Sequence, residues 1–179
     1  MTTDTGTQAR VRPAAGMTAE HTVLTTRLGD LTIVRDGELL TGLYFPHHWY
    51  RPSPATFGPR TGQGFADVTR QLGEYLDGTR TEFDLPLDAR GSDFQRSVWE
   101  LIAEIPYGHT ASYGDLARRL GDGTDPRDVG AAVGRNPLSI LIPCHRVVGS
   151  TGNLTGYAGG LPRKRALLDL EQTGTPGLW

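Results

Sequence analysis

The 179-residue sequence has a single cysteine, and it has no apolar run long enough to span a bilayer. One cysteine excludes an intramolecular disulfide, a four-thiolate zinc site and a CxxC redox pair. The first residues have no apolar segment of the kind found in secretory signals. These absences favour a cytoplasmic protein without a membrane partner.

Lysine is as scarce as cysteine, because Lys164 is the only one in the chain. The 18 basic residues face 20 acidic ones, which gives a formal net charge of −2 and no overall attraction to a polyanion. The positive charge is nearly all guanidinium, which suits bidentate contacts with phosphate and stacking on bases. This bias is compatible with nucleic-acid binding, but a bias toward arginine has other causes too.

The amino-terminal half alternates strand patterns with turn residues. Residues 1–19 are small and polar without a period, and they predict a disordered tail. A helix is predicted over 65–78, where apolar residues recur at helical spacing before a glycine. Strand-like or extended runs lie at 22–28, 31–35, 39–45 and 81–88. The first three of these runs predict an antiparallel meander.

Helical patterns dominate the second half. Ser92 or Asp93 can cap the first of these helices, and Pro126 suits the first turn of another. The two short central helices and the turn between them fit a helix-turn-helix, in which the second helix enters a DNA groove, or an ordinary helical hairpin. The predicted helices cover residues 94–105, 112–121, 126–136 and 161–172.

The lone cysteine, Cys144, follows an apolar run and Pro143, and it precedes His145 and Arg146. A lone cysteine is most often a small buried hydrophobe. An adjacent histidine can accept the thiol proton, directly or through a water, and a nearby guanidinium favours the thiolate. These residues leave a structural and a reactive cysteine both open.

The segment NPLSILIPCHRVVGSTGNLTGYAGGLPRKRALLDLE, residues 136–171, resembles the active-site region of the O6-alkylguanine-DNA alkyltransferases, also called methylated-DNA–protein-cysteine methyltransferases. The PCHRV motif is highly specific for that family. The similarity extends to residues 93–117 and, more loosely, to 25–45, so it covers most of 21–173. The resemblance implies an α/β fold, with an amino-terminal ribonuclease-H-like domain and a mostly helical carboxyl-terminal domain that contains the helix-turn-helix.

On this basis we expect four segments along the chain. They are a disordered tail (1–19), the ribonuclease-H-like α/β domain (20–90), the helix-turn-helix alkyltransferase domain with the cysteine (91–173) and a short second tail (174–179).

The resemblance also implies a reaction. Family members bind double-stranded DNA through its minor groove, flip out the O6-alkylguanine and move its alkyl group permanently onto their own cysteine, so each molecule acts once. O6-methylguanine is the main expected substrate, and O4-methylthymine is a second candidate. No cofactor or metal is expected. The protein is expected to be a monomer, with cooperative binding on DNA left open.

Catalytic roles follow from matched positions. Cys144 corresponds to the nucleophile, His145 to the residue that takes its proton, and Glu171 to the carboxylate that orients that histidine. Tyr113 corresponds to the phenol that protonates or hydrogen-bonds guanine N3, a step that keeps the leaving base neutral. Asn136 corresponds to the residue that braces the turn before the cysteine.

Arg127 corresponds to the arginine that enters the base stack when the lesion leaves it. The other positions expected to contact DNA are Tyr113, Asp128, Ala131 and Arg135. The expected pocket for the base is formed by Pro143, Val147, Tyr157 and Ala158, with the carbonyls of Cys144 and Val147 facing the guanine amine and the amide of Ala158 facing O6.

The start of the second helix departs from the family pattern. Asp125 and Asp128 add negative charge beside Arg127, which opposes phosphate binding. Asp128 has three possible roles: it caps the helix, faces the groove, or pairs with Arg127. His47 and His48 form a weak metal signal, for which an exposed or partly packed pair in a loop is the simpler interpretation.

Two other functions remain as alternatives. Alkyltransferase-like proteins bind the lesion without repairing it, but they lack the cysteine that is present here as Cys144. A thiol hydrolase with a Cys144–His145–Glu171 relay would turn over many times, whereas repair would stop near one product per protein molecule.

Overall fold

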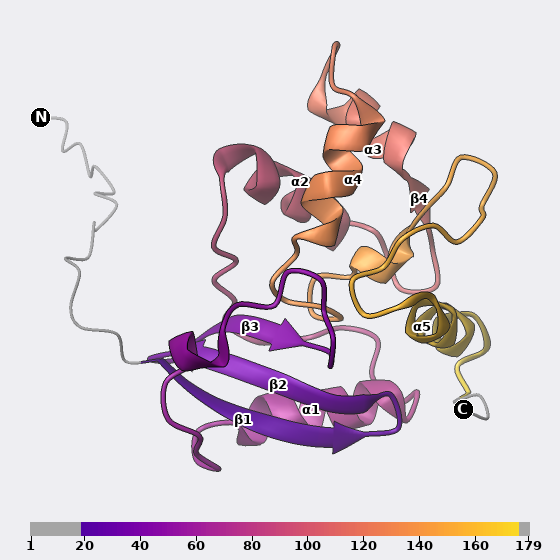
Figure 1. Cartoon of the computed structure of the whole chain (residues 1–179). Helices are drawn as coiled ribbons and strands as arrows, with labels where there is room; N and C mark the ends of the chain where they lie inside the picture. The colour runs from indigo at the N-terminus through magenta and orange to yellow at the C-terminus, as the bar shows by residue number, and fades with distance from the viewer. Residues whose placement is uncertain (1–18, 176–179) are drawn as a thin grey trace, which may run out of the picture.

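The computed structural model describes residues 19–175. The predicted tail over 1–19 therefore lies outside the described residues except for Ala19, which begins the first strand. The amino-terminal half opens with an antiparallel meander in the order β1-β2-β3 (Figure 1). Its strands are β1 (Ala19–Thr26), β2 (Gly29–Asp36) and β3 (Leu39–Tyr44).

Helix α1 (Ala66–Leu76) lies beneath this sheet (Figure 1). It buries Val68, Leu72 and Tyr75, which recur at the helical spacing noted in the sequence. A short 3-10 turn, η1 (Pro54–Thr56), lies in the connection between β3 and α1. The predicted meander and helix are therefore present.

The predicted extended segment at 81–88 does not form a regular strand. Its contact with β3 is a single bridge between Leu40 and Leu87, supported by the bond from the Leu40 amide to the Pro86 carbonyl. Pro86 has no amide hydrogen to continue a ladder. Further along, β3 instead pairs with residues 137–139, so the sheet reaches directly to the segment before Cys144.

The carboxyl-terminal half begins at α2 (Asp93–Ala103), where Ser92 is the cap. The Ser92 side chain accepts from the Gln95 amide, and the Gln95 side chain accepts from the Ser92 amide, which together form a capping box. Strand β4 (Ala111–Ser112) leads into α3 (Tyr113–Leu120), and a turn connects α3 to α4 (Pro126–Gly134). Helices α3 and α4 thus form the predicted helix, turn and helix.

Helix α4 is fixed against α2 by apolar packing and by one buried bond. The indole nitrogen of Trp99 donates to the Ala132 carbonyl at 2.8 Å. This bond orients one side of α4 toward the core and leaves the opposite side exposed.

The remaining elements surround the cysteine. They are the 3-10 turn η2 (Cys144–Arg146), strand β5 (Val147–Val148), which pairs in parallel with β4, and helix α5 (Leu161–Thr173). Gly174 ends α5 in the left-handed conformation, with φ of 64°.

One apolar cluster runs through both halves of the molecule. Arg163 on α5 adds a polar connection, because its Nε donates to the Leu28 carbonyl in the β1–β2 turn at 2.6 Å and its guanidinium lies over the Phe45 ring. Within residues 19–175, no helix is long and apolar enough to cross a bilayer. The same part of the chain has no group of three or more His, Cys, Asp or Glu side chains placed to bind a metal ion.

Candidate active site

The turn before the cysteine is held by Asn136. Its Nδ2 donates to the Ile142 carbonyl at 2.8 Å, and its Oδ1 accepts from the Leu138 amide at 3.0 Å. Ile140 lies between them with φ of 71°, a left-handed conformation that is rare for a β-branched residue. Asn136 therefore supports a strained turn, and it does so from a fully buried position.

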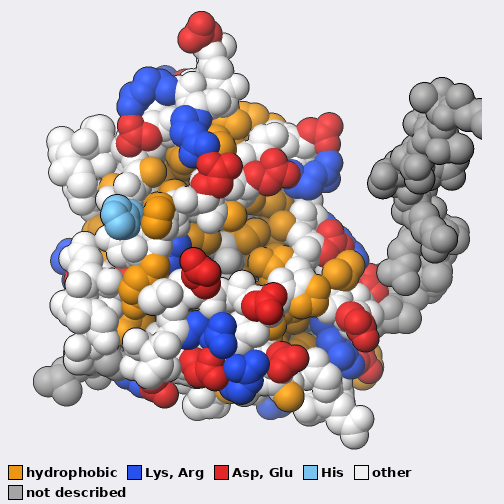
Figure 2. Space-filling view, turned by 180° about the vertical axis from the view of Figure 1, so that it is seen from behind, with side chains coloured by type: hydrophobic (Ala, Val, Ile, Leu, Met, Phe, Trp, Pro, Cys, Tyr) orange, Lys and Arg blue, Asp and Glu red, His pale blue; other side chains and the backbone are white. Residues whose placement is uncertain are grey.

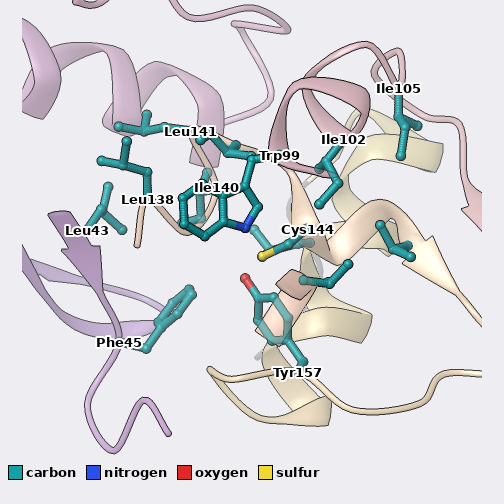
Figure 3. Packing of buried hydrophobic residues seen from close by; sticks show 14 of the residues in the cluster. Leu43, Phe45, Trp99, Ile102, Ile105, Leu138, Ile140, Leu141, Cys144 and Tyr157 are labelled. Atoms are coloured by element: carbon teal, nitrogen blue, oxygen red, sulfur yellow. The ribbon is translucent and has the colours of Figure 1, made fainter. Parts of the chain in front are cut away.

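Cys144 is buried at the start of η2, among Trp99, Tyr157 and the apolar turn. Figure 3 shows the Tyr157 hydroxyl pointing toward the sulfur. Burial raises the pKa of the Cys144 thiol. Three polar neighbours act in the opposite direction: Asn136, Lys164 and Tyr157. The thiol is therefore protonated at neutral pH in this state and needs a base to become a nucleophile.

His145, the next residue in the chain, is the candidate for that base. Its ring is fully buried, and Nε2 lies 2.8 Å from the Glu171 Oε1 atom. Burial lowers the pKa of His145, which keeps the imidazole neutral, although Glu171 acts against this shift. A proton on Nε2 satisfies the carboxylate and leaves Nδ1 as the acceptor, and Nδ1 has no hydrogen-bond partner among the described residues. The predicted pairing of His145 with Glu171 is thus present.

Glu171 is the most heavily hydrogen-bonded carboxylate of the site. Burial opposes its ionisation, but hydrogen bonds from His145, Arg146 and Tyr75 hold its pKa well below the usual range. The donors are Tyr75 Oη at 2.6 Å, Arg146 Nε and Nη2 at 2.9 and 2.8 Å, and the Gly108 amide at 3.2 Å. Glu171 therefore remains a carboxylate that fixes the orientation of the imidazole.

Tyr75 is a member of this network that the sequence did not indicate. It comes from α1 in the amino-terminal half, it is fully buried, and its hydroxyl also lies 3.3 Å from His145 Nε2. Burial raises the pKa of Tyr75 well above its usual value, so the phenol keeps its proton and donates it in the hydrogen bond to Glu171. No local motif surrounds Tyr75, and its helical spacing predicts only a core residue.

The sequence suggested that Arg146 supplies the positive charge beside the thiol. The structure shows that it does not. Arg146 turns toward Glu171 and the Ile105 carbonyl instead. The single lysine supplies the charge, because the positive charge of Lys164 lowers the pKa of Cys144. Lys164 is completely buried, and its Nζ donates to the carbonyls of Val147, Thr155 and Gly156 at 2.6, 3.0 and 3.2 Å. Burial lowers the pKa of Lys164 to about 8.

A small hollow, called here the α4 pocket, lies between α4 and the glycine-rich loop. Its lining residues are Trp49, Tyr113, Gly130, Val133, Gly134, Gly156, Tyr157 and Ala158. Tyr157 links the pocket to the cysteine, because its side chain lines the pocket and its hydroxyl points toward the Cys144 sulfur. The structure thus brings together the predicted Tyr113, Tyr157 and Ala158.

Two other predicted pocket residues lie elsewhere. Pro143 lines a separate hollow with Ile105 and Arg146. Val147 does not line the α4 pocket, and its carbonyl accepts from Lys164 at 2.6 Å and keeps one lone pair for another donor.

Tyr113 is the first residue of α3 and forms part of the pocket wall. Its hydroxyl donates to the Thr155 carbonyl at 3.1 Å. Burial raises the pKa of Tyr113, with the Thr155 bond acting against this shift. The phenol therefore carries its proton at neutral pH and is able to donate it to a group that enters the pocket.

The exposed side of α4 carries Arg127, Ala131 and Arg135 at intervals of four residues, which places them in one row. The cap of this helix is Asp125 rather than Asp128, because the Asp125 side chain accepts from the Arg127 amide. Asp125 also holds the Arg127 guanidinium, with 3.3 Å between Oδ1 and Nε. The side-chain cap and the pairing with Arg127, two of the roles considered for Asp128, thus belong to Asp125. Asp128 is exposed in the first turn of α4, where its charge still favours the helix N-terminus.

Arg135, at the other end of the row, lies over the Tyr50 ring at 4.3 Å from its centroid. On the face opposite that of Figure 1, acidic and basic side chains are interspersed around an apolar hollow (Figure 2). Among the described residues of that face, neither sign of charge forms a continuous patch.

The fold and the site together define a protein with a helix-turn-helix of the kind that binds DNA. This motif is followed by a buried cysteine beside a histidine–carboxylate pair. Two family models match the chain in agreement with this description. The ribonuclease-like domain of 6-O-methylguanine DNA methyltransferase matches residues 20–89, and the DNA-binding domain of the same protein matches residues 93–173. The chain belongs to the 6-O-methylguanine DNA methyltransferase family.

Individual relatives agree with this assignment. The methylated-DNA–protein-cysteine methyltransferase of Mycobacterium tuberculosis is 47% identical over 149 residues, or 83% of this chain and 90% of the relative. The Haemophilus influenzae protein of the same name is 39% identical over 153 residues, or 85% and 86%. The crystal structure of Mycobacterium tuberculosis OGT in complex with DNA has a TM-score of 0.82 at 42% identity and covers 88% of this chain and 96% of that one. The family, the α/β fold with a helical DNA-binding domain and the methyltransferase class predicted from the sequence are confirmed.

Proposed function

We propose that this protein repairs DNA by moving the alkyl group of O6-alkylguanine, above all O6-methylguanine, onto its own Cys144. The observation that carries the proposal is the buried Cys144 beside a neutral His145 whose Nδ1 is free to accept a proton, while Glu171 orients the ring. A DNA complex of a relative at 42% identity supports DNA as the substrate.

The transfer exchanges one bond for another. The thiol proton moves to Nδ1 of His145, directly or through a water, and the sulfur attacks the alkyl carbon, so that a carbon–sulfur bond forms as the bond between carbon and O6 breaks. Tyr113 gives a proton to guanine N3, and the base leaves neutral. The proton on His145 returns to Tyr113 through solvent. The thioether has no leaving group that water displaces readily, so the protein acts once.

The base must leave the duplex to reach the sulfur. We propose that the row on α4 faces the minor groove and that Arg127 enters the stack in place of the flipped base. Extruding a base costs a few kcal/mol, less where its pairing is already damaged, and a guanidinium plane recovers part of the lost stacking. The exposed position of Arg127 and Arg135 supports this assignment. Ala131 lies between them and allows close approach of the helix, and Asp128 weakens phosphate contact.

The α4 pocket would receive the base, with Tyr157 and Ala158 on its inner wall and the Val147 carbonyl within the same region. Pro143 would act indirectly, by fixing the direction in which the chain enters η2. We further propose that residues 20–90 support the site and that 91–173 form the alkyltransferase domain. In this assignment the protein works as a monomer and without a cofactor.

The test is the intact mass of the protein after incubation with excess duplex that carries O6-methylguanine. We expect a gain of one methyl group per molecule, mapped to Cys144 by peptide analysis, and no further product at longer times. Cys144→Ser should gain no mass yet bind the duplex, because an alkoxide is far harder to form than a thiolate. Continued product formation by the wild type would identify the thiol hydrolase instead, and methylation of the Ser variant would reject the nucleophile.

A further inference from the structure

The outer wall of the α4 pocket is a tryptophan from the amino-terminal half. Trp49 lies in the loop after β3, and it lines the pocket together with Tyr113 and Tyr157. The side chain nevertheless keeps 63% of its surface exposed. Large aromatic side chains are mostly well buried, so an indole left open at the mouth of a pocket calls for an explanation.

The loop is anchored on both sides of Trp49. The imidazole of His48 is buried against the Tyr44 ring, and its Nδ1 accepts from the Tyr50 amide at 3.2 Å. The Tyr50 ring in turn lies beneath the Arg135 guanidinium of α4. These contacts hold the backbone of the loop near the pocket, while Trp49 itself remains largely exposed.

The indole lies close to the glycine-rich loop at the pocket. A methyl group added at Gly156 would lie 3.8 Å from the Trp49 Cη2 atom, which is ordinary van der Waals contact. On the inner side, Tyr157 is buried and packs edge-on against Phe45 with ring centroids 6.0 Å apart (Figure 3). The inner wall is therefore fixed and the outer wall is not.

The volume between these walls is too small for a base. The α4 pocket encloses about 50 Å³, whereas pockets that bind small molecules usually enclose about 300–1,000 Å³. Entry of a base therefore displaces part of the lining. Buried side chains such as Val133 and Tyr157 are close-packed and resist displacement. Trp49 is the lining residue that moves at the lowest cost.

We propose that Trp49 determines substrate specificity, because its indole is the movable outer wall of the α4 pocket and limits the size of the O6-alkyl group that reaches Cys144. This inference rests on the proposed function, since it takes the α4 pocket as the site of the flipped base. A methyl group requires a small displacement of the indole, and a bulky group requires a larger one. The wall therefore favours methyl over larger alkyl groups.

The experiment compares single-turnover transfer from duplexes that carry O6-methylguanine or O6-benzylguanine. We expect Trp49→Ala to raise the benzyl-to-methyl rate ratio by about tenfold or more, since a single methylene in an apolar pocket is worth about 10–200-fold. Trp49→Phe should give an intermediate ratio. Leu161→Ala, which removes another exposed apolar side chain outside the pocket, should leave the ratio unchanged. Thermal melting of each variant checks that the fold is retained.

The outcomes separate the two proposals. If the wild type acquires a methyl group but Trp49→Ala leaves the ratio unchanged, the size-limiting role is overturned. Equal slowing of both substrates would also overturn it, because this result would make Trp49 a general DNA or base contact. A wild-type protein that acquires no methyl group would overturn the proposed function itself.

Discussion

Tyr75→Phe tests whether the amino-terminal half tunes the catalytic relay. The change removes one oxygen and leaves the buried ring in place. That oxygen donates to Glu171 Oε1 at 2.6 Å and lies 3.3 Å from His145 Nε2. A hydrogen bond to a charged group is worth about 1.5–3 kcal/mol. For a domain of this size, we expect the melting temperature to fall by about 3–12 °C.

The pH dependence of transfer gives the sharper result. Glu171 loses a donor in the variant, so more of its negative charge acts on the imidazole and favours the imidazolium. The pKa of His145, which burial lowers in the wild type, should therefore rise. Transfer needs neutral His145, and its rate falls as the pH drops through the pKa of that residue. The acid limb of the rate profile should accordingly move to higher pH in Tyr75→Phe.

The assay is single-turnover methyl transfer measured from pH 5 to 8 with O6-methylguanine duplex, with both proteins kept below their melting temperatures. Tyr107→Phe is the matched control, because Tyr107 packs edge-on against Tyr75 but its hydroxyl reaches only the Leu170 carbonyl, at 3.5 Å. Its acid limb should coincide with that of the wild type. An unmoved limb in Tyr75→Phe, despite a lower melting temperature, would refute the electrostatic reasoning and leave Tyr75 as a packing residue. A limb that moves to lower pH would refute the sign of the coupling.

Three further predictions concern the DNA side of the site. Tyr113→Phe should slow methyl transfer by about 10²–10⁴-fold, the usual contribution of a general acid, and should weaken duplex binding much less. Equal losses in the transfer rate and in duplex affinity would make Tyr113 a packing residue. Asp125→Asn keeps the oxygen that caps α4 but removes the charge that holds Arg127, so it should bind undamaged duplex more tightly, most clearly at low salt, with little change in melting temperature. Asp128→Ala should also bind undamaged duplex more tightly in the same salt series, and it leaves the side-chain cap of α4 intact. Equal affinities of the variant and the wild type at every salt concentration would show that Asp128 does not face the phosphates.

Several parts of the structure follow from short stretches of sequence. The capping box at Ser92 and the turn at Gly37, whose φ of 61° suits glycine, depend only on neighbouring residues. The adjacency of Cys144 and His145 is likewise local. The cap at Asp125 was equally open to prediction, because an aspartate directly before a proline at the first helical position is a typical helix start.

Other features depend on contacts between residues far apart in the chain. Tyr75 reaches Glu171 across 96 positions, and Trp49 borders a pocket whose other walls come from the second half. Arg146 turned to Glu171 and left Lys164 as the charge near the thiol, although Arg146 is closer in sequence. Helical spacing and local charge identify a residue as core or surface, but they do not say which distant group it meets. That choice is made by how α1, η2 and α5 pack together, because only their packing decides which buried donor satisfies which buried acceptor.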